Sequence, residues 1–246
     1  KGAISVMGTV ESAILEAGKC IEVKNGIFGK GKGKVTAGIN VVSFFLQNAE
    51  VCAPQDVIVG NQILNSRVFA RRHVEIRHGK SSLIGGITVA GSDVRAKSIG
   101  SEYGVRTVIE VGYDFLIMER MLYVNEKEKS LRNKLTLLEN SLDQELRCRG
   151  LSDEEIHKLR RDAQKRQDAL QAAITHMRTE YKSLTNQLYL TNKPQIFATD
   201  TIYPDVVARF HDTRYKFRVP VPSAVVGFDP QTEKITIASR GKEFHS

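Results

Sequence analysis

Two hydrophobic patterns divide the chain. In residues 8–112 apolar and polar positions alternate in short runs separated by Gly, Asn, Asp and Ser, which predicts short strands joined by turns. From about residue 114 to residue 190 leucines recur at three- and four-residue spacing, which predicts long helices. Residues 194–240 return to strand-like runs such as YKFRV and KITIA, punctuated by prolines. We therefore expect a mainly β protein with a long α insertion.

The first β region contains a loose repeat anchored on an alanine. The anchors are Ala17, Ala37, Ala53, Ala70 and Ala90, at spacings of 20, 16, 17 and 20 residues. Small residues lie four positions before each anchor, and mostly apolar residues lie two before and four after it. Such a repeat is typical of a β-solenoid, whose coils stack about 4.8 Å apart. We interpret the alanines as tight corners, and their uneven spacing favours a right-handed parallel β-helix over a left-handed hexapeptide helix.

A polar position five residues before the anchor holds asparagine in two coils, as Asn48 and Asn65. Stacked amides can hydrogen-bond along the axis of a solenoid. We expect a short structural asparagine ladder there, and we assign neither residue a catalytic role.

The helical region predicts an antiparallel coiled-coil hairpin over residues 114–190. The first arm has heptad spacing at Leu131, Leu135, Leu138 and Leu142. We expect the turn near residues 149–152, where Gly150 is a C-terminal stop and Ser152 with Glu155 forms a capping box. Residues 1–113 would form the β-helix, and residues 191–246 would form a C-terminal β segment that packs on it or caps its open strand edges.

Charge and composition exclude several classes of protein. With 41% hydrophobic residues the chain can bury a core, and its net charge of +8 is spread thinly without a nucleic-acid-binding motif, so we expect no nucleic-acid partner. The basic stretch Gly29–Lys34 lacks the spacing of a phosphate-binding loop; a solvated turn explains it, and anion binding there stays open. Six dispersed histidines indicate no metal site.

The cysteines and the apolar runs indicate a compartment. Cys20, Cys52 and Cys148 form no CxxC pair, so we expect them to be reduced. No apolar run reaches the length of a membrane span, and we expect a cytoplasmic protein. Because the chain opens on Lys1 in mid-pattern, we also expect that an N-terminal part is missing.

Several segments carry a family resemblance. They are VIVGNQILNSRVFARRHVEI from residue 57, GGITVAGSDVRAKSIGSEYGVRTVIEVG from residue 85 and DTIYPDVVARF from residue 200. Together with the hairpin they resemble the bacterial flagellar assembly protein A (FapA) family, formerly a domain of unknown function, over nearly the whole chain. The solenoid is also similar to the C-terminal domain of the division-site inhibitor MinC and to the bactofilins. The chain departs from the family's glycine-rich turns at Pro54-Gln55 and Arg71-Arg72.

The resemblance implies a non-catalytic bacterial scaffold or assembly factor, linked to flagellar assembly or to organisation of the cell pole or surface. The solenoid would provide structure or self-association, and the hairpin would dock a protein partner through residues such as Tyr123, Met177 and Tyr181. We expect no catalytic residue, no cofactor, no metal and no small-molecule substrate.

The alternative is a β-helix enzyme that acts on carbohydrate or acyl substrates. Asp56 and Asp93 share one position of the repeat, three residues after the anchor, and His73 occupies that position between them. A turn-forming polar residue explains this position at least as well.

Overall fold

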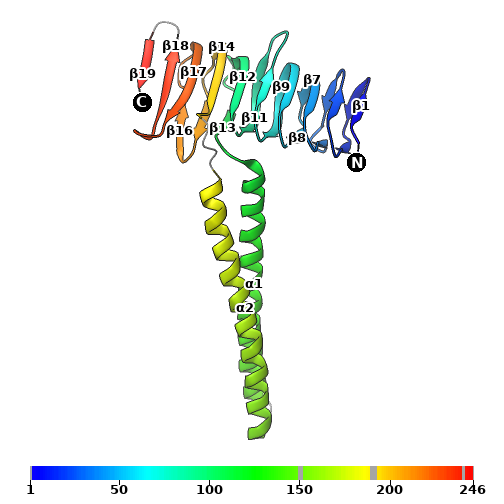
Figure 1. Cartoon of the computed structure of the whole chain (residues 1–246), viewed down its shortest axis with the longest axis vertical. Coiled ribbons are helices and arrows are strands. Elements are labelled where there is room, and N and C mark those ends of the chain that lie inside the picture. The colour runs from blue at the N-terminus through cyan, green and yellow to red at the C-terminus, as the bar shows by residue number, and fades with distance from the viewer. Residues whose placement is uncertain (1, 149–151, 189–192, 240–241, 246) are drawn as a thin grey trace. The chain divides into compact units, whose positions relative to one another are not determined.

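The computed structural model describes residues 2–148, 152–188, 193–239 and 242–245. It divides into two compact units, of which one comprises Lys1–Leu116 with Tyr189–Ser246 and the other comprises Ile117–Leu188. The first unit is built of strands and the second of helices (Figure 1). The expectation of a mainly β chain with a helical insertion is therefore confirmed.

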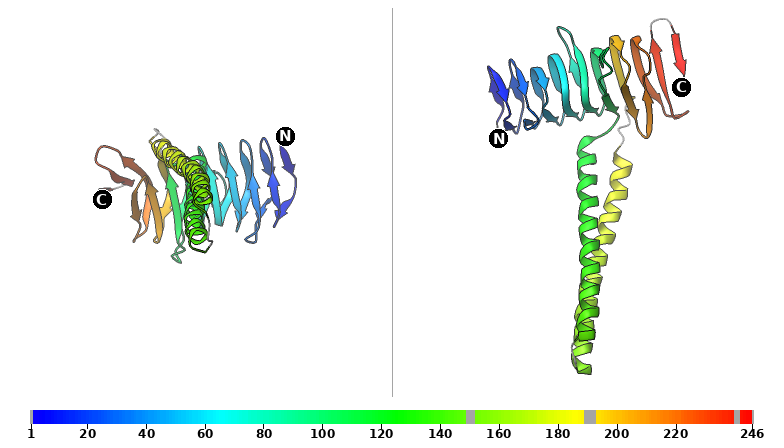
Figure 2. Two further views of the ribbon diagram at one scale, coloured as in Figure 1. Left: turned by 90° about the horizontal axis from the view of Figure 1, so that it is seen from below. Right: turned by 180° about the vertical axis from the view of Figure 1, so that it is seen from behind.

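The β unit is a β-solenoid, whose coils lie side by side in both views of Figure 2. On its first face a column of apolar residues runs from coil to coil in parallel register, through Ile4, Ile21, Val41, Val57, Val74, Val94 and Ile196. This face is built from β1 (Ile4–Val6), β4 (Ile21–Val23), β7 (Val41–Gln47), β9 (Val57–Ala70), β10 (Val74–Ile76), β12 (Asp93–Ile99) and β14 (Gln195–Ile202).

A second face follows after a turn in each coil. It is built from β2 (Thr9–Glu11), β5 (Gly26–Phe28), the end of β7, the middle of β9, the start of β11 (Ser82–Ala90) and the ends of β12 and β14. The stacked residues are Val10, Ile27, Leu46, Ile63, Leu83, Ile99 and Ile202. All are buried, so this column fills the core from a second side.

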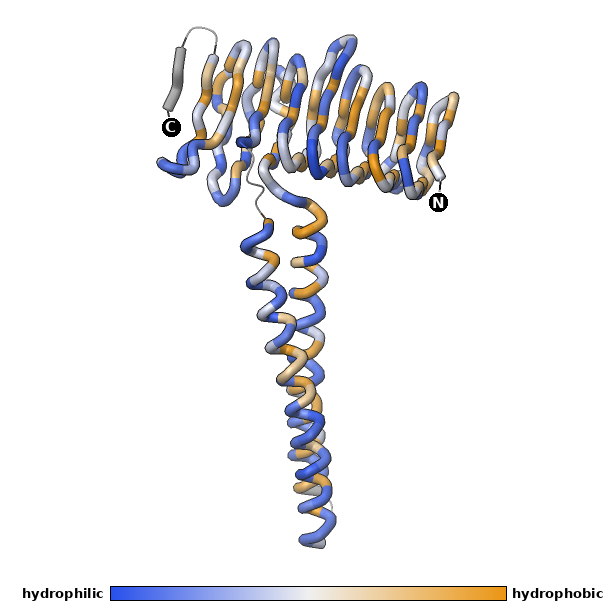
Figure 3. Tube along the Cα trace, in the orientation of Figure 1, coloured by the Kyte–Doolittle hydropathy of each residue, from blue (hydrophilic) through white to orange (hydrophobic). Residues whose placement is uncertain are grey.

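The third face leads back to the alanine corners. It is built from β3 (Ile14–Glu16), β6 (Lys34–Thr36), β8 (Glu50–Ala53), the ends of β9 and β11, β13 (Thr107–Val111) and β15 (Val206–Phe210). Its inward column runs through Leu15, Val35, Val51, Val68, Thr88, Ile109 and Ala208. In Figure 3 hydrophobic and hydrophilic residues alternate along the coils accordingly.

The C-terminal strands pair in the opposite sense. They are β16 (Thr213–Lys216), β17 (Val221–Asp229), β18 (Lys234–Ser239) and β19 (Lys242–His245). β16 pairs with β15, and β17 pairs with β14, both antiparallel; β18 and β19 continue the antiparallel series. Parallel stacking therefore ends at β14 and β15.

The helical unit contains most of α1 (Phe115–Cys148) and all of α2 (Asp153–Gln187). The two helices lie side by side in Figures 1 and 2 and bury Val124, Ala163, Ile174 and Leu184. The predicted capping box is confirmed, because the Ser152 hydroxyl accepts from the Glu155 amide and the Glu155 carboxylate accepts from the Ser152 amide. Gly150 and the rest of the predicted turn at 149–151 lie outside the described residues.

Neither helix, over its described residues, has an apolar stretch long enough to cross a membrane.

Candidate functional site

The repeat position three residues after each alanine, where Asp56 and Asp93 suggested an enzyme, carries a series of hydrogen bonds from backbone amides to side chains. The Asp56 amide donates to Asn40 Oδ1 at 3.0 Å, and the His73 amide donates to Asp56 Oδ1 at 3.1 Å. Further along, the Gln195 amide donates to Asp93 Oδ1 at 3.2 Å. Each acceptor thus holds the start of the next coil, as a turn-forming polar residue does.

Basic side chains lie beside both carboxylates. Arg95 Nη2 lies 3.0 Å from Asp93 Oδ2, and Arg72 Nε lies 3.9 Å from Asp56 Oδ1, the oxygen that also accepts from the His73 amide. His73 Nδ1 lies 3.6 Å from Asp93 Oδ2, which is too long for a hydrogen bond. A shallow hollow of about 620 Å³ is lined by His73, Asp93 and Arg72 together with Pro54, Gln55, Arg71, Ser92 and Lys193.

This arrangement presents carboxylates that are already engaged. One oxygen of Asp56 and one of Asp93 accept a backbone hydrogen bond, and both side chains are largely buried, with 20% and 15% exposure. The described residues contain no group of three His, Cys, Asp or Glu side chains placed to hold a metal ion. Asp56 and Asp93 therefore contribute to the geometry of the turns.

Arg71, one of the two departures from the family's glycines, has a structural partner. Its Nε donates to Asp114 Oδ2 at 2.7 Å, and the Asp114 side chain is only 3% exposed. Asp114 Oδ1 in turn accepts from the Leu116 amide at the start of α1. Because a buried carboxylate without a partner is costly, Arg71 supports the segment from which α1 begins. The sequence reasoning missed this pair, since 43 residues separate its members.

The predicted corners occupy equivalent positions. Ala53 is the register partner of Ala70, and Ala70 is the partner of Ala90. These three are completely buried, Ala37 is 3% exposed and Ala17, in the first complete coil, is half-buried. The same column continues to Val111 and Phe210, so larger side chains fill the corner toward the C-terminal end.

Asn48 and Asn65 share a backbone conformation. Their φ angles are +49° and +43°, and Ser12 and Gly85 at the same repeat position have φ of +48° and +71°. Asparagine tolerates this left-handed region better than most residues with a side chain. Among the described residues no hydrogen bond joins the two amides, so the ladder of side chains stays a prediction, whereas the shared turn conformation is observed.

The basic stretch Gly29–Lys34 uses its backbone amides internally. Gly31 N donates to Asn48 O at 3.1 Å, and the amides of Lys32 and Gly33 both donate to Gly29 O. Lys30 lies 2.7 Å from Glu11, and Lys34 lies 3.0 Å from Glu50. This turn therefore offers a bound anion no free amides at Gly31, Lys32 or Gly33.

On the helical unit, the candidate docking residues lie close in sequence to two ion pairs that join the helices. Arg120 and Glu180 are 2.6 Å apart, and Arg178 and Glu128 are 2.9 Å apart. On α1, between Arg120 and Glu128, Tyr123 is 52% exposed, with the Arg120 guanidinium 5.0 Å from its ring centroid. Tyr181 is 39% exposed, and Met177 is half-buried.

These ion pairs also shift the ionisation of their members. The hydrogen bond to Glu180 raises the pKa of the Arg120 guanidinium. The hydrogen bond from Arg132, followed by that from Arg178, lowers the pKa of Glu128. Glu128 therefore stays ionised at pH values below the usual pKa range of a glutamate. Its ion pair with Arg178 links the two helices.

Stacked coils of one repeat, followed in sequence by two long helices and by strands that return to the same sheet, define a β-solenoid protein with a helical insertion. The chain matches the Flagellar Assembly Protein A beta solenoid domain family, FapA, over residues 1–234 and belongs to that family. The resemblance drawn from the sequence is thereby confirmed. No curated protein and no solved structure gave a match.

Proposed function

We propose that this chain is a non-catalytic bacterial scaffold or assembly factor. Its solenoid, right-handed and closed at one end by the antiparallel C-terminal strands, provides the structural body and a surface for self-association. Its helical unit is an antiparallel coiled coil that docks a protein partner. The role is cytoplasmic and belongs to flagellar assembly or to the organisation of the cell pole or surface, in line with the name of the family.

The observation that carries this proposal is the helical unit. It is compact in itself, and its helices of 34 and 35 residues extend about 50 Å at 1.5 Å per residue. Structural capping alone does not require such length. Tyr123 and Tyr181 expose their rings close in sequence to two inter-helix ion pairs, and such aromatic anchors dominate the energy of many interfaces.

The non-catalytic part of the proposal is supported by the hydrogen bonds of Asp56 and Asp93 on the solenoid. Asp93 accepts from the Gln195 amide with one oxygen and faces Arg95 with the other, and Asp56 accepts from the His73 amide with Oδ1, which also faces Arg72. A general acid or base needs a free oxygen directed toward a substrate, and both oxygens of Asp93 are engaged.

The docking assignment is tested on the whole chain with a triple variant, Tyr123→Ser, Met177→Ser and Tyr181→Ser. Proteins captured from lysate of the native bacterium by the unaltered chain should be depleted about tenfold or more with the variant, because aromatic anchors contribute most of the binding energy. Leu137→Ser is the matched control, since Leu137 is 67% exposed on α1 away from this stretch. Equal capture by the triple variant and the unaltered chain would remove the assignment.

A further inference from the structure

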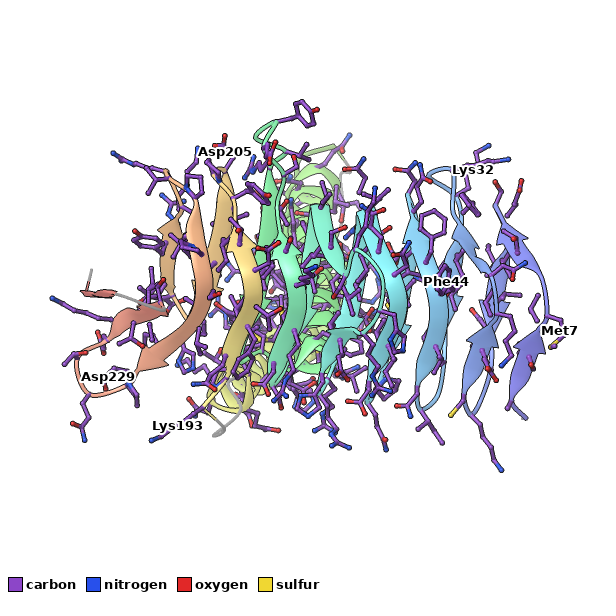
Figure 4. The ribbon with its side chains drawn as sticks, turned by 90° about the horizontal axis from the view of Figure 1, so that it is seen from above. Met7, Lys32, Phe44, Lys193, Asp205 and Asp229 are labelled. Atoms are coloured by element: carbon purple, nitrogen blue, oxygen red, sulfur yellow. The ribbon has the colours of Figure 1, made fainter. Side chains whose placement is uncertain are left out.

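A groove crosses the outer side of three neighbouring strands of the β unit. β15 lies between β13, its parallel partner, and β16, its antiparallel partner. The groove has a volume of about 650 Å³ and is lined by Gly104, Arg106, Val108, Asp205, Val207, Arg209, Arg214 and Lys216. Asp205 is labelled in Figure 4 on the same long edge of the solenoid as Lys32, and Lys193 is on the opposite edge.

Four cations and two carboxylates surround this groove. Arg209 Nη1 lies 2.7 Å from Glu110 Oε1, and Lys216 Nζ lies 2.6 Å from Asp205 Oδ1. Arg106 and Arg214 form no ion pair with any carboxylate among the described residues. The groove therefore carries an excess of positive charge, and the described residues do not neutralise it.

The strand register places two of these cations next to each other, so the excess positive charge destabilises the protein when the groove is empty. Arg209 and Arg214 are direct partners in the antiparallel pair of β15 and β16. Like charges placed directly opposite each other in a sheet are destabilising. Glu110 compensates Arg209 from the other side, so Arg214 is the cation whose charge a ligand would neutralise.

The floor of the groove is apolar. Val108 and Val207 are register partners on β13 and β15, and Val207 is opposite Lys216 on β16. Three strands span about 10 Å at a separation of about 4.8 Å, a width that fits one extended chain. An occupant with carboxylates on its flanks and an apolar side chain toward the valines matches both the charge and the polarity of the groove.

We propose that this groove binds an acidic, extended segment of a partner protein, with carboxylates directed at Arg106 and Arg214 and an apolar side chain on Val108 and Val207. A phosphate polymer fits less well, because Asp205 lines the groove and Glu110 lies 2.7 Å from Arg209, and both carboxylates would repel closely spaced phosphates. The inference goes beyond the proposed function, because it assigns a recognition surface to the solenoid and not to the helices.

The test uses the full chain and a fluorescein-labelled peptide of four Glu-Val repeats. Fluorescence anisotropy should give binding that weakens with rising ionic strength, and Arg106→Gln with Arg214→Gln should raise the Kd by about tenfold or more, because hydrogen bonds between ionised partners are the strong ones. Lys19→Gln with Lys80→Gln is the matched control. It removes the same charge from exposed turns of the same unit and should change the Kd less than about twofold.

Three results would overturn the inference. The first is an equal loss of affinity in the groove variant and the control variant. The second is an unchanged affinity for the peptide in which Gln replaces Glu. The third is tighter binding of a single-stranded DNA oligonucleotide than of the peptide, with the same dependence on Arg106 and Arg214. The melting temperature of Arg214→Gln provides a check on folding, and it should equal or exceed that of the unaltered chain since the repulsion from Arg209 is removed.

Discussion

Gly86 lies at a corner of the solenoid where two coils approach each other closely. Its φ is +78°, and a Cβ atom added there would clash with the backbone carbonyl oxygen of Ser66, its register partner in the preceding coil. Gly31 has nearly the same φ, +77°, but an added Cβ would meet no atom within 4 Å. Comparing substitutions at the two glycines therefore separates the free-energy cost of a left-handed backbone from the cost of crowding between coils.

We predict that Gly86→Ala destabilises the protein more than Gly31→Ala does. Each substitution places an alanine in the left-handed region, which costs about 1–2 kcal/mol. Gly86→Ala must in addition push two coils apart, since the clashing atom belongs to the backbone. Urea denaturation followed by β-sheet circular dichroism should show a lower midpoint for Gly86→Ala. Equal midpoints would mean that the coils are packed less tightly at this corner than the structure indicates.

At the scale of single residues, the sequence predicted the positions that repeat and missed those that pair across long separations. The alanine corners and the shared repeat position of Asn48 and Asn65 follow from a local repeat, whereas the left-handed conformation of the two asparagines was not predicted. The groove around Arg106 and Arg214 depends on β13 and β15 being neighbours, although the helical insertion separates them in sequence. The sequence feature that could have predicted the pairing of β13 with β15 is the similarity of TVIEV, from residue 107, to VVARF, from residue 206.

At the scale of elements, two of the three faces of the solenoid were predictable. The first and third faces lie at fixed distances from each alanine, so their columns appeared in the repeat. The second face does not, because the turn between the first and second faces varies in length: Ile27 lies 10 residues after its anchor, whereas Leu83 lies 13 after. Loops absorb such insertions without disturbing the core.

Burial within the helical unit is uneven. The second helix buries Ala163, Ile174 and Leu184. The predicted heptad leucines Leu131, Leu135, Leu138 and Leu142 are only half-buried. A pair of helices encloses less surface than a bundle, so ion pairs at the flanks help to fix the register of the two helices.

Glu128 is the clearest of these flanking groups, and its role predicts a dependence on pH. Its pKa in the folded protein is lowered by Arg132 and Arg178, so its stabilising contribution is present above the ordinary glutamate pKa of about 4.3 and is lost as pH falls through the lowered value. Helix melting, followed at 222 nm between pH 6 and pH 3, should shift less with pH in Glu128→Gln than in the unaltered chain. The shift should be a few degrees at most, because exposed ion pairs contribute about 0.2–1 kcal/mol.

Glu126→Gln serves as the control for this measurement. Glu126 is exposed on the same helix and forms no ion pair among the described residues, so this variant removes the same charge without breaking the link between the helices. A pH response in Glu126→Gln that is as flat as in Glu128→Gln would show that net charge, and not the bridge, determines the effect.

At the scale of the whole molecule, the chain combines two units with different energetics. In a solenoid each coil contacts mainly its neighbours, so its stability is close to a sum of local terms and neighbouring interfaces. The helical unit, residues 117–188, has its own compact set of contacts. This division allows the helical unit to be removed while the columns of buried residues in the solenoid are kept.

The most direct measurement of the central claim compares the partners of the intact chain with those of a chain in which a short glycine linker replaces residues 117–188. Circular dichroism establishes first that the remaining β unit folds. Quantitative mass spectrometry of proteins captured from lysate of the native bacterium then measures what each form retains. The account predicts that at least one specific partner is lost with the helices, as expected of a scaffold that docks through its coiled coil. Retention of every partner by the shortened chain would contradict it.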